Sequence, residues 1–214
     1  MIMAVLLFHH PNNGVLILVS GYESGDTAVS YLNPMHNFWC PLYLSKAHSQ
    51  PILSLDVSPD KTFFLTSSAD ANIAKHPVPH ASFELGIETV ALREEVPSKL
   101  LKTGHSGQQS LRIRNDGKIF ATAGWDGRVR VYGVKTMKEL AVLKWHKEGC
   151  YAVAFAKVGT GEGTEGQSSN EDGKEVTEQT KRLTVRAQRE LRSQHGHWLA
   201  VGSKDAKVSL WGLY

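Results

Sequence analysis

Histidine, hydroxyl and carboxylate residues recur in this sequence at spacings that could support acid–base chemistry. The clearest set is His105, Thr122 and Asp126, and the aromatic residue Tyr132 follows the aspartate. A base, a hydroxyl and an orienting carboxylate are the groups of a hydrolytic triad. The same groups could instead satisfy one another as a buried brace, because a carboxylate away from water needs hydrogen-bond donors.

Comparable sets occur elsewhere in the chain, and their recurrence separates the two interpretations. A catalytic centre is built once in a domain, whereas a brace recurs with the structural unit that it supports. We therefore predict structural tetrads, no catalytic residues and no enzyme activity. The sets are His48, Thr66, Asp70 and His76; His105, Thr122, Asp126 and Tyr132; and His146, Asp205 and Trp211, where Val201 stands in place of the hydroxyl.

Short apolar runs separated by tight turns surround the clearest set. Residues 111–114 alternate between apolar and basic, and residues 115–118 form an Asn-Asp-Gly-Lys turn. Residues 119–122 make a second run, and residues 129–132 alternate again after Asp126 and Gly127. Runs of this length joined by Asn, Asp and Gly turns are typical of an antiparallel meander.

The meander repeats along the chain, which predicts one all-β domain of about four copies. The first copy is degenerate, with Ser24 where the other copies have the turn aspartate. The last copy contains an insertion at residues 157–194, and its acidic, glycine-rich part at 159–180 is predicted to be disordered. The copies span residues 1–44, 47–103, 104–143 and 145–214.

Composition and the remaining motifs argue against several classes of function. The net charge of +3 is a mild excess, and Cys40 and Cys150 form no disulfide framework. The apolar start at residues 1–10 lacks a basic region and is interpreted as a strand, and no apolar run reaches the ~20 residues of a membrane span. A GxGxxG pattern at residues 161–166 is rejected because its two glutamates would repel a pyrophosphate. We expect no cofactor, no metal, no small-molecule substrate and no membrane contact.

Two features outside the tetrads are candidates for binding a partner. Trp125 lies beside the turn aspartate of the third copy. A basic run at residues 181–192 could be a solvated insertion, a docking site for an acidic protein or a nucleic-acid contact, although no aromatic residues are interleaved for base stacking. Its basic residues are Lys181, Arg182, Arg186, Arg189 and Arg192.

The order Gly-His, turn aspartate and terminal aromatic resembles a WD40 repeat, whose period is about 40–45 residues. Residues 119–132, 135–143, 181–194 and 202–214, with the GYESGD stretch at 21–26, more specifically resemble the fungal ASTRA-associated protein 1 family. They also resemble its animal relative, the guanine-nucleotide-binding-protein beta-subunit-like WD protein.

The resemblance implies a WD40-type β-propeller whose His, Ser/Thr, Asp and aromatic residues form a hydrogen-bonded tetrad within each blade. Family members look like seven-bladed propellers, so a chain with about four readable blades is expected to be the C-terminal part of a longer, incomplete propeller. The implied function is a non-catalytic scaffold in the nuclear ASTRA complex, with protein subunits as partners and roles in chromatin remodelling and in maturation of phosphatidylinositol-3-kinase-related kinases. The alternative is a nucleic-acid-binding module that acts through residues 181–192.

Overall fold

A computed structural model describes residues 1–79, 95–105, 107–157 and 196–213 of the chain. Its regular elements in these ranges are all β-strands, and they form four antiparallel sheets that we name A to D. No helix in the described part of the chain is long and apolar enough to cross a membrane. The expected all-β class with about four meander units is confirmed.

Each sheet follows the order of its strands in the chain. Sheet A contains β1 (Ile2–His9), β2 (Leu16–Tyr22), β3 (Asp26–Asn33) and β4 (Phe38–Lys46). Sheet B contains β5 (Ile52–Val57), β6 (Phe63–Ser68), β7 (Asn72–Pro77) and β8 (Lys99–Lys102). Sheet C contains β9 (Gln108–Ile113), β10 (Ile119–Gly124), β11 (Arg128–Gly133) and β12 (Glu139–Lys144). Sheet D contains β13 (Cys150–Phe155), β14 (His197–Ser203) and β15 (Val208–Leu213).

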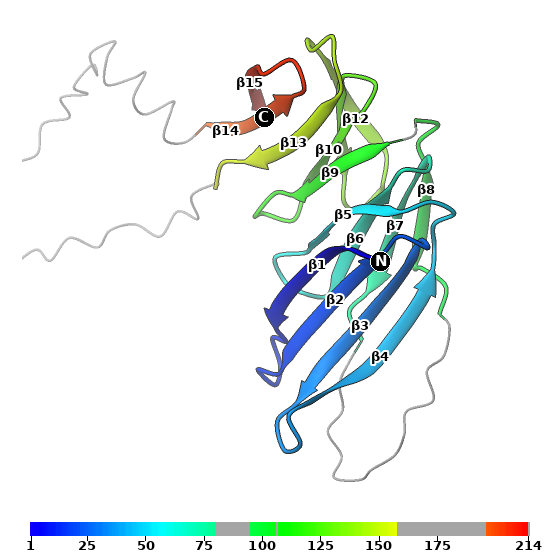
Figure 1. The fold of residues 1–214 in the computed structure, drawn as a ribbon. Coiled ribbons are helices and arrows are strands. Elements are labelled where there is room, and N and C mark those ends of the chain that lie inside the picture. The colour runs from blue at the N-terminus through cyan, green and yellow to red at the C-terminus, as the bar shows by residue number, and fades with distance from the viewer. Residues whose placement is uncertain (80–94, 106, 158–195, 214) are drawn as a thin grey trace, which may run out of the picture.

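The four sheets follow one another along an arc, from sheet A at the bottom of Figure 1 to sheet D at the top. The first strands of consecutive sheets are neighbours, so β1 lies against β5, β5 against β9 and β9 against β13. Hydrogen bonds reinforce these contacts. Ser54 Oγ accepts the Leu111 backbone N–H at 3.1 Å, and Asp56 accepts the Ile113 N–H at 2.8 Å. Ser110 Oγ likewise accepts the Val153 N–H at 3.4 Å, so polar side chains join the inner strands of three sheets.

The core lies between neighbouring sheets, and the second strands of the two middle sheets, B and C, are covered on both faces. In β6 and β10 the burial is almost continuous, which explains why their sequences are apolar or small instead of alternating. Three clusters fill the spaces between A and B, B and C, and C and D. Representative members are Phe8, Val29 and Phe64; Leu65, Leu111 and Phe120; and Ala121, Val153 and Leu199.

One strand was not predicted from the sequence, and one prediction lies outside the described residues. The strand β8 was not predicted, and it pairs with β7 as the outer strand of sheet B. The insertion at 157–194 is described only at residue 157, so the prediction of disorder at 159–180 lies outside the described residues.

Candidate functional site

Sheet B contains a continuous chain of polar contacts that begins at Asp70. His48 Nδ1 lies 3.1 Å from Asp70 Oδ1, and His48 Nε2 lies 2.8 Å from Thr66 Oγ1. Thr66 Oγ1 is also 3.1 Å from His76 Nε2. The structure therefore brings together all four residues that the sequence grouped in the second copy.

The chain of contacts continues into sheet A through Tyr43, whose hydroxyl lies 2.9 Å from His76 Nδ1. When both imidazoles are neutral, one assignment of protons satisfies every step, because a carboxylate can only accept. Tyr43 donates to His76, His76 to Thr66, Thr66 to His48, and His48 to Asp70. The two imidazoles then carry their protons on different ring nitrogens.

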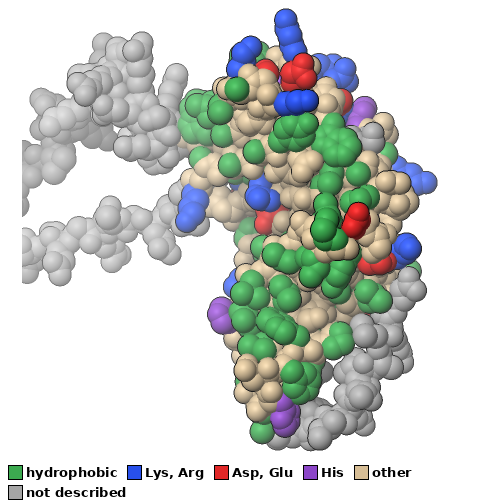
Figure 2. All heavy atoms as spheres, viewed as in Figure 1, with side chains coloured by type: hydrophobic (Ala, Val, Ile, Leu, Met, Phe, Trp, Pro, Cys, Tyr) green, Lys and Arg blue, Asp and Glu red, His purple; other side chains and the backbone are tan. Residues whose placement is uncertain are grey.

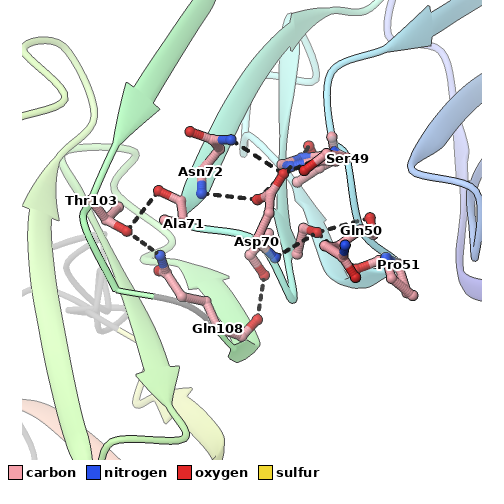
Figure 3. A network of polar contacts seen from close by, with 12 residues as sticks. Ser49, Gln50, Pro51, Asp70, Ala71, Asn72, Thr103 and Gln108 are labelled. Atoms are coloured by element: carbon pink, nitrogen blue, oxygen red, sulfur yellow. Dashed lines mark hydrogen bonds and ion pairs between the residues drawn. The ribbon is translucent and has the colours of Figure 1, made fainter.

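The turn that carries Asp70 is held by the backbone on both sides. Asp70 accepts the Ser49 N–H at 3.1 Å and the Asn72 N–H at 2.9 Å. Figure 3 shows these two residues converging on the carboxylate, with Gln108 and Thr103 of the next segment close by. The carboxylate therefore closes the loop between β6 and β7 against the segment that precedes β5.

Burial and hydrogen bonding shift the protonation equilibria of this network. Burial alone would raise the pKa of Asp70, but the hydrogen bond from His48, with those from the N–H groups of Ser49 and Asn72, lowers it to about 2. Burial lowers the pKa of His76 to about 3. At neutral pH Asp70 is ionised and His76 is neutral, which fits a permanent brace better than an acid–base catalyst.

Sheet C satisfies its turn aspartate with a different donor. Arg130 NH1 donates to Asp126 Oδ1 at 3.2 Å, and Arg130 NH2 donates to Asp126 Oδ2 at 2.6 Å. Arg130 is only 1% exposed, and its Nε lies 3.7 Å from Glu139. Burial would raise the pKa of Asp126, but the hydrogen bonds and charge of Arg130 hold it below its ordinary value.

In sheet C Arg130 makes the hydrogen bonds to Asp126 that the sequence assigned to His105, although His105 lies near enough for its charge to help lower the pKa of Asp126. Within the described residues no hydrogen bond joins the His105 ring to Asp126. Thr122 and Tyr132 are buried where the sequence placed them, and the Tyr132 ring stacks on Phe120 with a centroid distance of 5.0 Å. Burial raises the pKa of Tyr132 to about 12, so this phenol stays neutral.

The strand register explains the exchange of histidine for arginine. Thr66 faces Ala74 across β6 and β7, whereas Thr122 faces Arg130 across β10 and β11. The methyl group of Ala74 leaves space for an imidazole beside the threonine. In sheet C the long Arg130 side chain occupies that register position and reaches the aspartate itself.

Sheet D has a third arrangement, and it resolves the missing hydroxyl of the fourth copy. Val201 faces Ser209 across β14 and β15. Ser209 Oγ lies 2.9 Å from His146 Nε2 and accepts the Trp211 indole N–H at 2.8 Å. His146 Nδ1 lies 3.5 Å from Asp205. The hydroxyl has therefore moved to the strand opposite its expected place.

Sequence reasoning missed Arg130 and Ser209, although one signal could have found them. Both residues follow their turn aspartate, Asp126 or Asp205, at the same spacing at which Ala74 follows Asp70. That spacing leads from the turn to the register position that faces Thr66, Thr122 or Val201 in the second strand.

The candidate partner-binding residues divide between described and undescribed parts of the chain. Trp125 is 46% exposed, and its indole N–H donates to Gln109 Oε1 at 2.9 Å. The basic residues Lys181, Arg182, Arg186, Arg189 and Arg192 lie outside the described residues.

Two other kinds of reactive group remain, potential metal ligands and the buried Cys150 thiol. In the described ranges no three His, Cys, Asp or Glu side chains are grouped to hold a metal ion. Burial raises the pKa of the Cys150 thiol to about 11, so this thiol is not a thiolate nucleophile at neutral pH.

Comparison with known proteins places this geometry in a family context. The family described as WD domain, G-beta repeat matches residues 39–74, 98–133 and 185–212. The first match runs from β4 to β7 and the second from β8 to β11, so each begins in the outer strand of one sheet and ends in the next sheet.

Relatives named ASTRA-associated protein 1 align with the whole chain. The protein from Verticillium alfalfae is 49% identical over 214 residues, and the one from Penicillium rubens is 44% identical over 247 residues. A third, from Pyricularia oryzae, is 37% identical over 292 residues. The alignments cover 100% of this chain but 50%, 55% and 61% of the three relatives, so the chain spans about half of their length.

Proposed function

We propose a function from one premise: this chain belongs to the WD40-repeat proteins of the ASTRA-associated protein 1 family, of which it spans about half the length. On that premise the chain is a non-catalytic scaffold within a multiprotein complex, and its partners are protein subunits. The name of the relatives gives the complex as ASTRA.

The observation that carries this proposal is how the polar residues of the sheets are used. His48, Thr66 and Asp70 bind one another inside sheet B, and Arg130 and Asp126 do the same in sheet C. Each set lies within a repeat and stabilises the turn that it belongs to. The residues that resemble a catalytic triad are therefore used to stabilise the fold. This use favours a rigid scaffold for other proteins over an enzyme.

The finer parts of the proposal come from the family resemblance. We propose a nuclear protein that takes part in chromatin remodelling and in maturation of phosphatidylinositol-3-kinase-related kinases. Repeated sheets with exposed loops on one edge are suited to such a role, because they present several surfaces at once while the core stays fixed.

The test is affinity purification of the full-length protein from its own cells, with nuclease treatment and identification of the bound proteins by mass spectrometry. We expect ASTRA subunits to be recovered in fixed proportion and to survive the nuclease. Recovery of the protein alone would reject the scaffold proposal. Recovery that nuclease abolishes, together with a steep loss of DNA or RNA binding as salt is added, would favour the nucleic-acid module at 181–192 instead.

A further inference from the structure

Two exposed tryptophans lie on the loop edge of sheets C and D, outside the hydrogen-bonded braces. Trp125 is 46% exposed and Trp145 is 55% exposed. The Trp125 ring rests against Gly107, where an added Cβ would clash with the ring, and Gln109 Oε1 accepts its indole N–H. Trp125 is therefore held in one orientation while its outer side remains in solvent.

The backbone joins these tryptophans into one surface. A Cβ at Gly149 would approach the Trp125 backbone at 3.1 Å, and the Lys204 N–H donates to the Gly149 carbonyl at 2.9 Å. The Trp145 ring has Lys207 Nζ above it, 6.0 Å from the ring centroid. The loops after β10, β12 and β14 thus meet at the same edge.

This surface is basic. Figure 2 shows Lys and Arg side chains gathered at the top of the view, where Figure 1 places the loop between β12 and β13. None of these cations forms an ion pair with an acidic side chain of the described residues, and Asp126 and Asp205 are engaged by Arg130 and His146. The exposed cations of the edge are Arg128, Lys144, Lys147, Lys204 and Lys207.

One pair of these cations is placed at a cost to the sheet. Arg128 and Lys144 face each other directly across β11 and β12. Like charges directly opposite each other destabilise a strand pair. Glu148, in the adjoining loop between β12 and β13, is an exposed acidic residue near this pair. An anionic partner would neutralise both cations at once. Binding such a partner would therefore explain a pair of cations that does not stabilise the sheet itself.

We propose that this basic tryptophan edge, formed by Trp125, Trp145 and the five cations, docks an acidic segment of a protein partner. The proposal rests on the scaffold function above and names the chemistry of its partner. The carboxylates of the segment lie against the cations, and an apolar side chain of the segment lies on the open side of Trp125. Such an edge combines charge, which directs encounter, with an aromatic anchor, which holds the complex.

The geometry favours a protein segment over single-stranded nucleic acid. Proteins that bind single strands stack successive bases on successive open aromatic faces along a basic groove. Here Trp125 has one side covered by Gly107, and Lys207 lies over the ring of Trp145. A single open anchor beside clustered cations suits one apolar side chain flanked by carboxylates.

The first test measures binding of a defined probe to the purified chain. The probe is a fluorescein-labelled peptide in which glutamates flank a central pair of leucines, and binding is followed by fluorescence anisotropy. We expect saturable binding that weakens as salt is added. The double variant Arg128→Glu with Lys144→Glu should weaken it about tenfold or more, and Trp125→Ala about tenfold.

The matched control reverses two exposed lysines, Lys135 and Lys138, in the turn at the opposite end of the same strand pair. This control should bind within about twofold of the unaltered chain, since it changes net charge equally but leaves the edge intact. Unfolding curves of all variants establish that each is folded. Absence of probe binding, or equal weakening by both double variants, would overturn the proposal. Tighter binding of an oligothymidine of equal charge would replace the acidic protein segment with nucleic acid.

The second test separates this proposal from the scaffold function. Full-length protein carrying Arg128→Glu and Lys144→Glu is purified from cells beside the Lys135→Glu and Lys138→Glu control. Loss of a subunit from the first and its retention by the second supports the docking edge. An unchanged complex in both overturns the docking edge and leaves the scaffold function standing. Failure of even the unaltered protein to bring down a complex rejects the scaffold function itself.

Discussion

Sheets B and C both have a threonine in the second strand and an aspartate in the following turn, but different side chains donate hydrogen bonds to the two aspartates. In sheet B the His48 imidazole reaches Asp70, whereas in sheet C the Arg130 guanidinium reaches Asp126. The difference lies in the residue that faces the second-strand threonine, which is Ala74 in one sheet and Arg130 in the other. The turn aspartate thus requires a hydrogen-bond donor in both sheets. The residue in the third strand determines whether that donor is an imidazole or a guanidinium.

The two pairings, His48 with Asp70 and Arg130 with Asp126, should respond differently to acid and to loss of the carboxylate. An arginine stays charged at every ordinary pH and is costly to leave unpaired, whereas a buried imidazole can be forced to take up a proton. Sheet C should therefore be more sensitive to loss of its carboxylate, and sheet B should be more sensitive to acid.

The largest expected effect is that of Asp126→Ala. This change removes both hydrogen bonds that Asp126 accepts from the nearly buried Arg130 and leaves only Glu139, 3.7 Å from Arg130 Nε. We therefore expect the free energy of unfolding to fall by up to about 3–5 kcal/mol. Asp70→Ala, the matched change in sheet B, leaves neutral donors unpaired and should cost about 1–3 kcal/mol. Urea unfolding followed by circular dichroism measures both.

The double variant Asp126→Ala with Arg130→Met is the control for this mechanism. It removes the unpaired charge and keeps side-chain volume, so it should be more stable than Asp126→Ala alone. A double variant less stable than Asp126→Ala would show that the guanidinium is not the source of the cost.

The second expected effect is acid destabilisation that originates in sheet B. The pKa of His76 is about 3 in the folded chain against an ordinary value of 6.5, so below pH 6.5 the unfolded chain binds a proton that the folded chain refuses. Stability is therefore full above pH 6.5 and lost as pH falls, by about 3 kcal/mol between pH 7 and pH 4. Asp70, with a pKa of about 2 against 3.8, adds a further loss below about pH 4.

Replacing the imidazole tests this assignment. In sheet C the equivalent Tyr132 stacks on Phe120, as His76 stacks on Phe64 at 4.8 Å, so His76→Tyr preserves the ring packing. Urea unfolding between pH 7 and pH 4 should show a flatter pH dependence for His76→Tyr than for the unaltered chain. Parallel curves would place the acid sensitivity in another part of the molecule.

A smaller difference is expected from the two buried threonines. Thr66→Val removes the hydroxyl that links His48 to His76, at a cost of about 1–3 kcal/mol. Thr122→Val removes a hydroxyl whose neighbouring aspartate is already satisfied by Arg130, and it should cost below about 1 kcal/mol. Thermal unfolding of the two variants side by side gives the comparison, and equal losses would contradict it.

The last comparison extends to sheet D, where a small loss and its partial recovery are expected. Ser209→Ala removes the hydroxyl shared by His146 and Trp211 and should cost about 1 kcal/mol. Adding Val201→Thr to this variant restores a hydroxyl at the facing register position, so part of the loss should be recovered in urea unfolding. No recovery would mean that the two positions are not equivalent.

The sheets could be predicted from the sequence because each strand combines a local pattern with a local turn signal. Residues 111–114, 119–122 and 129–132 fall within or beside β9, β10 and β11, and the Asn-Asp-Gly turn separates the first two. The strand β8 could not be predicted in this way, because it is short, lies mostly in solvent and follows no turn of this kind. Its place is set by pairing with β7.

The braces were predictable only where sequence spacing alone determines the contact. His48, Thr66 and Asp70 fall together because the turn and the second strand position them. Arg130 and Ser209 depend on which residues face each other across two strands, and Tyr43 reaches His76 from a different sheet. Those relations arise only when the strands pair and the sheets pack.

The staggered repeats have a consequence for how such a protein can grow. The matched unit at 98–133 starts in the outer strand of sheet B and supplies the first three strands of sheet C. A gene duplication that copies this unit therefore never delivers a free-standing sheet. Each new copy completes the sheet before it and leaves its own sheet for the next copy to complete. Successive copies are therefore joined by strand pairing as well as by the chain. The unit that is duplicated and the unit that folds need not have the same boundaries.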